Sequence, residues 1–216
     1  AFALGTMGQD AAEALPNLIT ALKHEADGDE SQVVRAISRV GTAAVPALLA
    51  ASIDTDLPLA RLVAALAGIG PSATQLLVAA LNDNQASVRI IAARALGRMT
   101  VTPASAITAL TARLQDPSAD VRGASASALG RSRHPGDGAV VALFAAANDN
   151  DSDVRAAAVL ALASIELPAE KVLPVLATSL ADDDAAVRGK AIAGLEHLGN
   201  AANSVLPEIT AALSDD

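Results

Sequence analysis

Arginine and aspartate recur together at a fixed spacing, and their chemistry stands out first. Four arginines follow one another at intervals of 33 residues, each with an aspartate six residues before it: Arg89, Arg122, Arg155 and Arg188 with Asp83, Asp116, Asp149 and Asp182. Guanidinium and carboxylate groups form strong bidentate hydrogen bonds. The spacing therefore predicts a row of pairs that orients neighbouring repeats, in which each arginine binds the aspartate of its own repeat or of an adjoining one.

A second group of arginines stands outside this pattern: Arg35, Arg39, Arg94, Arg98 and Arg131. Residues 35–133 contain ten Arg and five Asp, a local balance of +5 within a chain of net charge −9. Arg94 and Arg98 are four residues apart and share a helix face, and stacked repeats should bring Arg98 near Arg131. Because arginine suits carboxylate and phosphate, we predict that this group binds an acidic peptide, a phosphorylated segment or another anion. Scattered surface arginines are the alternative.

Other candidate chemistry has simpler structural explanations. The segment DNDSD (149–153) superficially has the alternating oxygens of a calcium loop, but Val154 replaces the required glycine, and helix capping explains the segment better. His24, His134 and His197 lack a second ligand at metal spacing, and the chain has no cysteine. The segment HPGDG (134–138) is interpreted as a flexible loop. No catalytic residue, metal site or cofactor is predicted, and an enzyme is not expected.

Composition favours helices. Hydrophobic residues make up 52% of the 216 residues, chiefly alanine and leucine, and aromatic residues only 1%. Small aliphatic side chains suit closely packed helices, so an all-α fold is predicted. The net charge of −9 indicates repulsion from nucleic acid and anionic membranes. No apolar run of about 20 residues is apparent, so no membrane span is predicted, and the compartment stays open.

The arginine pattern is part of a longer repeat of two helices. An apolar residue lies seven positions after each of the four arginines, at Leu96, Leu129, Leu162 and Leu195, and the series extends back to Leu66, Ile37 and Leu4. In one copy Asp116 is predicted to cap a second helix that starts at about residue 117 and buries Val121, Ser125 and Leu129. Prolines eight residues before an aspartate are predicted to bend the first helix: Pro46, Pro174 and Pro207. Gly97, Gly130 and Gly199 suit a helix end or a close crossing.

The order proline, aspartate, Val-Arg and a closing Leu-Gly-x-Ile/Met-Gly resembles the HEAT family. The 33-residue unit is most similar to the short HEAT-like repeats of the phycobilisome-lyase type. In residues 57–70 Leu59 occupies the position of the repeated arginine, and Ala163 stands where a glycine is usual. The resemblance implies a right-handed α-solenoid of stacked helix pairs, whose second helices line a concave inner surface.

Residues 1–216 are predicted to form a single solenoid, a half-repeat followed by about six full repeats. The opening AFALGTMG, without an initiator Met, indicates a piece of a longer protein, and this end and the closing TAALSDD are expected to contact other chains or flanking sequence. The function predicted is a non-catalytic scaffold that binds a protein or peptide partner. The alternative is a subunit of a bilin-lyase-type enzyme that handles a chromophore; a DNA-repair glycosylase of HEAT-like fold is more remote.

Overall fold

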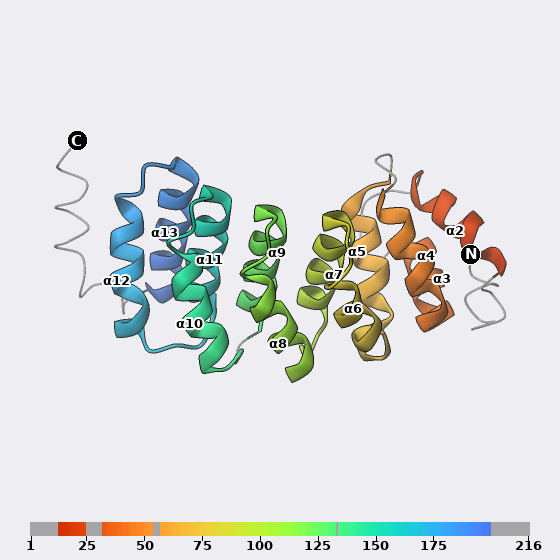
Figure 1. The fold of residues 1–216 in the computed structure, drawn as a ribbon, viewed down its shortest axis with the longest axis horizontal. Helices are drawn as coiled ribbons and strands as arrows, with labels where there is room; N and C mark the ends of the chain where they lie inside the picture. Colours follow the sequence, from red (N-terminus) through yellow and green to blue (C-terminus); the bar gives the residue numbers. More distant parts are fainter. Residues whose placement is uncertain (1–12, 25–31, 54–56, 133, 200–216) are drawn as a thin grey trace. The chain divides into compact units, whose positions relative to one another are not determined.

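Helices make up all of the regular structure in the part of the chain described, residues 13–24, 32–53, 57–132 and 134–199 of a computed structural model (Figure 1). The first α-helices are α2 (Leu15–Leu22), α3 (Gln32–Val40), α4 (Val45–Ala50), α5 (Leu59–Gly68), α6 (Thr74–Ala80), α7 (Ala86–Arg98) and α8 (Ala104–Arg113). The others are α9 (Ala119–Gly130), α10 (Asp137–Ala146), α11 (Ser152–Ser164), α12 (Ala169–Leu180) and α13 (Ala185–Leu198). The 3-10 helices η2 (Gly41–Ala44), η3 (Ala51–Ile53) and η4 (Gly70–Ala73) lie between the α-helices from α3 to α6. The all-α prediction is confirmed.

The chain forms two compact units, residues 1–109 (unit 1) and residues 110–216 (unit 2). In unit 1, α5 packs against both α3 and α7, while α2 packs on α3 and α6 on α7. In unit 2, α11 packs against both α9 and α13, while α10 packs on α11 and α12 on α13. Each unit is therefore built from helix pairs whose second helices lie next to one another.

The core of each unit follows the predicted apolar series. Ile37, Leu66 and Leu96 are fully buried in unit 1, as are Leu129 and Leu162 in unit 2. Leu195 is only half-buried, and Leu4 lies outside the described residues. Burying an aliphatic side chain of this size contributes about 1.5 to 3 kcal/mol, so each residue of the series stabilises the packing of its helix.

Two helix boundaries differ from the sequence prediction. The helix that carries Arg122, α9, begins at Ala119 with Ser118 as its N-cap, two residues later than expected. Asp116 instead accepts a hydrogen bond from the Ser118 N–H (3.0 Å), an Asx turn that keeps Pro117 outside the helix. The predicted loop at 134–138 likewise ends early, because α10 begins at Asp137 after Gly136, whose φ is 84°.

The prolines behave differently from one another. Pro174 lies inside α12, as predicted. Pro46 instead occupies the first turn of α4, where a missing N–H costs no helical hydrogen bond, so the predicted bend does not apply there. Pro207 lies outside the described residues.

One helical stretch meets the length and composition expected of a membrane span, which the sequence analysis did not predict. It runs over Gln32–Ile53, with 22 residues and a mean hydropathy of 1.5. The pair Leu59–Gly68 and Gly70–Ala80 qualifies only if joined across a bend of 106°. Such a stretch is weak evidence for a span, because core helices have the same composition. Here Val33, Val34 and Ile37 are buried against the rest of unit 1.

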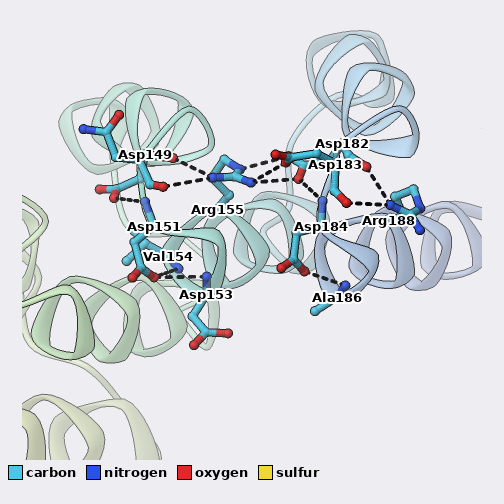
Figure 2. Close-up of polar contacts among 11 residues, drawn as sticks. Asp149, Asp151, Asp153, Val154, Arg155, Asp182, Asp183, Asp184, Ala186 and Arg188 are labelled. Atoms are coloured by element: carbon cyan, nitrogen blue, oxygen red, sulfur yellow. Dashed lines mark hydrogen bonds and ion pairs between the residues drawn. The ribbon is translucent and has the colours of Figure 1, made fainter.

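The predicted row of arginine–aspartate pairs is present in unit 2 and joins neighbouring repeats. Figure 2 shows the pair of Arg155 and Asp182. Arg155 binds Asp182 of the next repeat through Nε and Nη2, at 2.9 and 2.8 Å. Arg122 binds Asp149 in the same way, at 2.8 and 2.7 Å. The sequence left open which aspartate each arginine would bind, and the structure selects that of the following repeat.

Each of these arginines also holds the turn of its own repeat. Nη1 of Arg155 donates to the carbonyl oxygen of Asp149 at 3.0 Å, and Nη1 of Arg122 donates to that of Asp116, also at 3.0 Å. Hydrogen bonding to Arg155 lowers the pKa of Asp182 to about 2, and hydrogen bonding to Arg122 lowers the pKa of Asp149. One guanidinium group thus joins two consecutive inter-helix turns.

Candidate functional site

Three of the five predicted binding arginines meet at one hollow of about 400 Å³ on the face of unit 1 made by its second helices. Arg35 and Arg39 come from α3, and Arg98 comes from the end of α7. The remaining lining residues are Val34, Ser38, Ala64, Ala67, Gly68 and Thr100. We call this site the arginine hollow.

The hollow exists because the middle helix, α5, has small residues where its neighbours have arginines. Counting from the buried anchors Ile37, Leu66 and Leu96, the position two residues later is Arg39 on α3, Gly68 on α5 and Arg98 on α7. Two residues before the anchors, the corresponding residues are Arg35, Ala64 and Arg94. Since α5 packs between α3 and α7, its short side chains form a floor between two arginine-bearing walls.

Close packing of α3 against α5 fixes one side of this floor. The Ser38 hydroxyl lies 2.8 Å from the carbonyl oxygen of Val34 and 3.4 Å from that of Ala65. A Cβ atom on Gly68 would collide with the Ser38 hydroxyl oxygen. Gly68 therefore allows the two helices to approach and also keeps the floor low.

The ionisable side chains that line the hollow are all positively charged. The lining contains three guanidinium groups and, among the described residues that form it, no carboxylate. Arg35, Arg39 and Arg98 are exposed. Arg35 and Arg39 lie one helical turn apart, where like charges repel. Such an arrangement can attract and orient an anion.

The other two predicted arginines lie elsewhere. Arg94 is exposed on α7, one turn before Arg98, and does not line the hollow. Arg131 is exposed at the end of α9 in unit 2. Its predicted proximity to Arg98 concerns two different units and stays a prediction.

Sequence reasoning missed the floor of the hollow. Ala64, Ala67 and Gly68 are ordinary residues in an alanine-rich chain, and none has a functional group that draws attention. The signal that identifies them is their place in the repeat, because Ala64 and Gly68 occupy the positions of Arg35 and Arg39. Leu59 replaces the repeated arginine in this copy, but the feature that forms the floor is the absence of arginines later in the same helix, at Ala64 and Gly68.

The acidic segment 149–153 acts as a capping turn, as predicted (Figure 2). Asp151 is the N-cap of α11 and accepts hydrogen bonds from the N–H groups of Asp153 and Val154, at 3.1 and 3.2 Å. Asp149 accepts from the Asp151 N–H at 2.9 Å as well as from Arg122. Asp184 caps α13 through the Ala186 N–H, and this bond lowers the pKa of Asp184.

The predicted surface histidines are exposed, and His134 has a carboxylate neighbour. His24, His134 and His197 all lie at the surface. His134 Nε2 is 3.4 Å from a carboxylate oxygen of Glu166.

Paired helices with neighbouring second helices define the α-solenoid class of protein. The family model for HEAT repeats matches residues 58–130 and 107–196, together more than half of the sequence. The chain therefore belongs to the HEAT-repeat family. No curated protein matches it.

Solved structures support the same fold. An engineered protein is 24% identical with a TM-score of 0.53, over 89% of this chain and 92% of that one. A designed armadillo repeat protein in complex with the peptide (KR)4 is 21% identical with a TM-score of 0.50, over 86% and 99%. The karyopherin Kap121p, bound to the extreme C-terminus of the protein phosphatase Cdc14p, is 14% identical with a TM-score of 0.56, over 97% of this chain and 27% of that chain. At these identities the likeness is one of fold alone.

Proposed function

We propose that this chain is a non-catalytic binding module that holds an acidic protein or peptide partner on the second-helix face of unit 1. The observation that carries the proposal is the arginine hollow, where Arg35, Arg39 and Arg98 line one concavity without a carboxylate in its described lining. Arginine donors in a fixed fork suit carboxylate and phosphate acceptors. Complementary charge also accelerates encounter with the partner and excludes partners of the wrong sign.

The fold supports this use of the surface. Solenoids present long faces to elongated partners because each repeat contacts only its neighbours. The designed armadillo repeat protein in complex with (KR)4 is a solenoid with a basic peptide. In this chain the hollow is basic, so the complementary peptide is acidic.

The proposal is tested with a short fluorescent peptide rich in Glu and a counterpart in which every Glu is Lys. Binding is followed by fluorescence anisotropy at two salt concentrations. The Glu peptide should bind more tightly, and binding should weaken as salt rises, because exposed charges are screened beyond a Debye length of about 8 Å at physiological ionic strength. Arg35→Glu/Arg39→Glu should weaken binding by roughly 30-fold or more, since two attractive contacts become repulsive.

A matched control separates the hollow from the total charge of the protein. Lys171 and Lys190 are exposed residues of unit 2, and Lys171→Glu/Lys190→Glu changes the net charge by the same amount. This control should retain binding. Equal losses in the two double variants, or tighter binding of the Lys peptide, would contradict the proposal.

The subtype of HEAT repeat remains a prediction from sequence. Similarity to the phycobilisome-lyase type rests on the 33-residue unit, whereas the match found is to HEAT repeats in general. A chromophore-handling role is tested by adding a bilin and recording its absorption spectrum with and without the protein. An unchanged spectrum would contradict that alternative.

A further inference from the structure

The two walls of the arginine hollow are separated by one whole helix. Neighbouring packed helices lie about 8 to 10 Å apart, and α5 packs between α3 and α7, so the walls are about two such spacings apart. Arg35 and Arg39 extend from one wall and Arg98 from the other. An anion above Gly68 therefore lies between arginines that approach from different directions.

This geometry distinguishes between the two common anionic groups of proteins. The two oxygens of a carboxylate lie in one plane and suit a single guanidinium fork. A phosphomonoester has three terminal oxygens that point in different directions, and it carries about −1.5 to −2 charges at neutral pH. A single phosphate can therefore accept hydrogen bonds from both walls, whereas carboxylates would have to be supplied by separate side chains.

We propose that the arginine hollow binds a phosphorylated side chain of the partner peptide, with the phosphate held between Arg39 and Arg98 above Gly68. This inference rests on the proposed function and specifies its ligand. Arg35 adds charge from the α3 wall, and the hydroxyls of Ser38 and Thr100 line the same hollow.

The remaining lining suits the carbon part of such a side chain. Ala64 and Ala67 form the apolar part of the floor and Val34 lines the α3 side, and the hollow of about 400 Å³ is larger than a phosphate group alone. The phosphate fills the arginine-lined part, and the methylene or ring that carries it lies on the alanines. Ala67 is half-buried, so its methyl group borders the space that the ligand would occupy.

The test uses one labelled peptide in three forms that differ at a single position: serine, phosphoserine and glutamate. Binding is measured by anisotropy, with inorganic phosphate as a competitor. The phosphoserine form should bind at least about tenfold more tightly than the glutamate form, because the phosphate has more charge and more acceptors. Inorganic phosphate should compete only at far higher concentrations, because it lacks the carbon contacts.

Two variants test charge and shape separately. Arg98→Gln removes one wall and should reduce the preference for phosphoserine over glutamate to less than about threefold, since the remaining α3 wall binds either anion. Ala67→Met raises the floor without changing any charge and should weaken the phosphoserine form. Lys171→Gln and Ala79→Met, at exposed positions outside the hollow, are the matched controls and should leave both affinities unchanged. Thermal unfolding checks that every variant is folded.

The outcomes separate this inference from the function on which it rests. If the glutamate and phosphoserine forms bind equally well through Arg35 and Arg39, the phosphate preference is wrong and the acidic-partner function stands. If inorganic phosphate competes as effectively as the phosphopeptide, the ligand is a free anion and the inference is overturned. If neither anionic form binds and the Glu-rich peptide also fails, both proposals are wrong.

Discussion

Arg122 and Arg155 of unit 2 and the arginines that line the hollow of unit 1 perform opposite tasks. In unit 2, the side chains of Arg122 and Arg155 are each only 16% exposed, and both bind a carboxylate of the next repeat and a carbonyl of their own turn. In unit 1, Arg35 and Arg39 are exposed and line a hollow. The position of each arginine in its repeat explains why some are paired and others are exposed. Arg122 and Arg155 lie seven residues before a buried anchor leucine, where each meets two inter-helix turns. Arg39 and Arg98 lie two residues after an anchor, in the last turn of their helices, and are exposed.

The space beside the glycines at the helix crossings also differs between the units. Replacing the glycine of the tighter crossing should have the largest effect on stability. A Cβ on Gly130 would lie 2.6 Å from Cα of Ala161, which is backbone and cannot move aside, whereas on Gly68 it would collide with the Ser38 hydroxyl oxygen and lie 3.3 Å from the Ser38 Cβ, both side-chain atoms. Gly130→Ala should therefore destabilise by about 3 kcal/mol, and Gly68→Ala by about 1 kcal/mol or less because a serine side chain can rotate.

Chemical denaturation measures these changes, with Gly123→Ala as the control on the same helix as Gly130. The nearest atoms to a Cβ on Gly123 are at 4.0 Å, so this substitution should stabilise by about 0.5 to 1 kcal/mol through helix propensity. A loss for Gly68→Ala as large as that for Gly130→Ala would break the contrast between the two crossings.

The second prediction concerns Arg155, which binds both the Asp182 carboxylate of the next repeat and the Asp149 carbonyl of its own repeat. Arg155→Ala should lower the free energy of unfolding by about 1 to 3 kcal/mol, because it leaves the partly buried Asp182 carboxylate without its guanidinium partner. Arg188 is the matched control, since in the described part of the chain its side chain donates only to the backbone carbonyls of Asp182 and Asp183. Arg188→Ala should cost less than about 1 kcal/mol. Equal losses in the two variants would show that the carboxylate pair adds nothing.

The third prediction is a pH dependence of unit 2. The pKa of Asp182 in the folded protein is about 2, below its ordinary value of 3.8. A depressed folded-state pKa contributes stability above the unfolded pKa and loses it as the pH falls. The contribution should therefore be complete above about pH 4 and disappear toward pH 2, a change on the order of 1 to 2 kcal/mol after solvent screening.

Asp182→Asn isolates this effect in chemical denaturation between pH 5 and pH 2. The variant should be less stable than the wild type at the higher pH, and the difference should shrink as the pH falls. A constant difference over this range would contradict the depressed pKa of Asp182.

The smallest expected effect concerns the hollow. Arg35→Gln or Arg39→Gln should change the free energy of unfolding by no more than about 0.5 kcal/mol, with a slight gain from relieved repulsion between like charges one turn apart. Thermal unfolding measures it. A loss comparable to that of Arg155→Ala would show that these arginines are structural and would remove the contrast between the two groups.

Much of the fold was predictable because single residues recur at fixed positions in each repeat. The 33-residue spacing of Val-Arg and the buried anchors Ile37, Leu66 and Leu96 predicted paired helices and an aspartate partner for each arginine. The choice of partner was not predictable, because it depends on the distance between repeats. The helix start was misplaced at Asp116 because both Asp116 and Ser118 are good N-cap residues, and the Asx turn decides between them.

Only the charged residues of the candidate site were predictable from the sequence. Arg35, Arg39 and Arg98 were identified from local charge and helical spacing. Their convergence depends on what the intervening helix lacks, and Ala64 and Gly68 have no chemistry of their own. Because α5 packs between α3 and α7, the absence of two long side chains on α5 leaves a concavity between the neighbouring helices.

The bonds of Arg122 and Arg155 to the aspartate 27 residues ahead have a consequence for how such a chain can lengthen. The repeat that contains Asp149 and Arg155 accepts a guanidinium group from the preceding repeat at Asp149 and donates one to the next repeat from Arg155. A duplicated 33-residue segment inserted between two such repeats would carry a partner for both neighbours. The gene could therefore gain or lose whole repeats by unequal recombination without any new contact having to evolve at the junction.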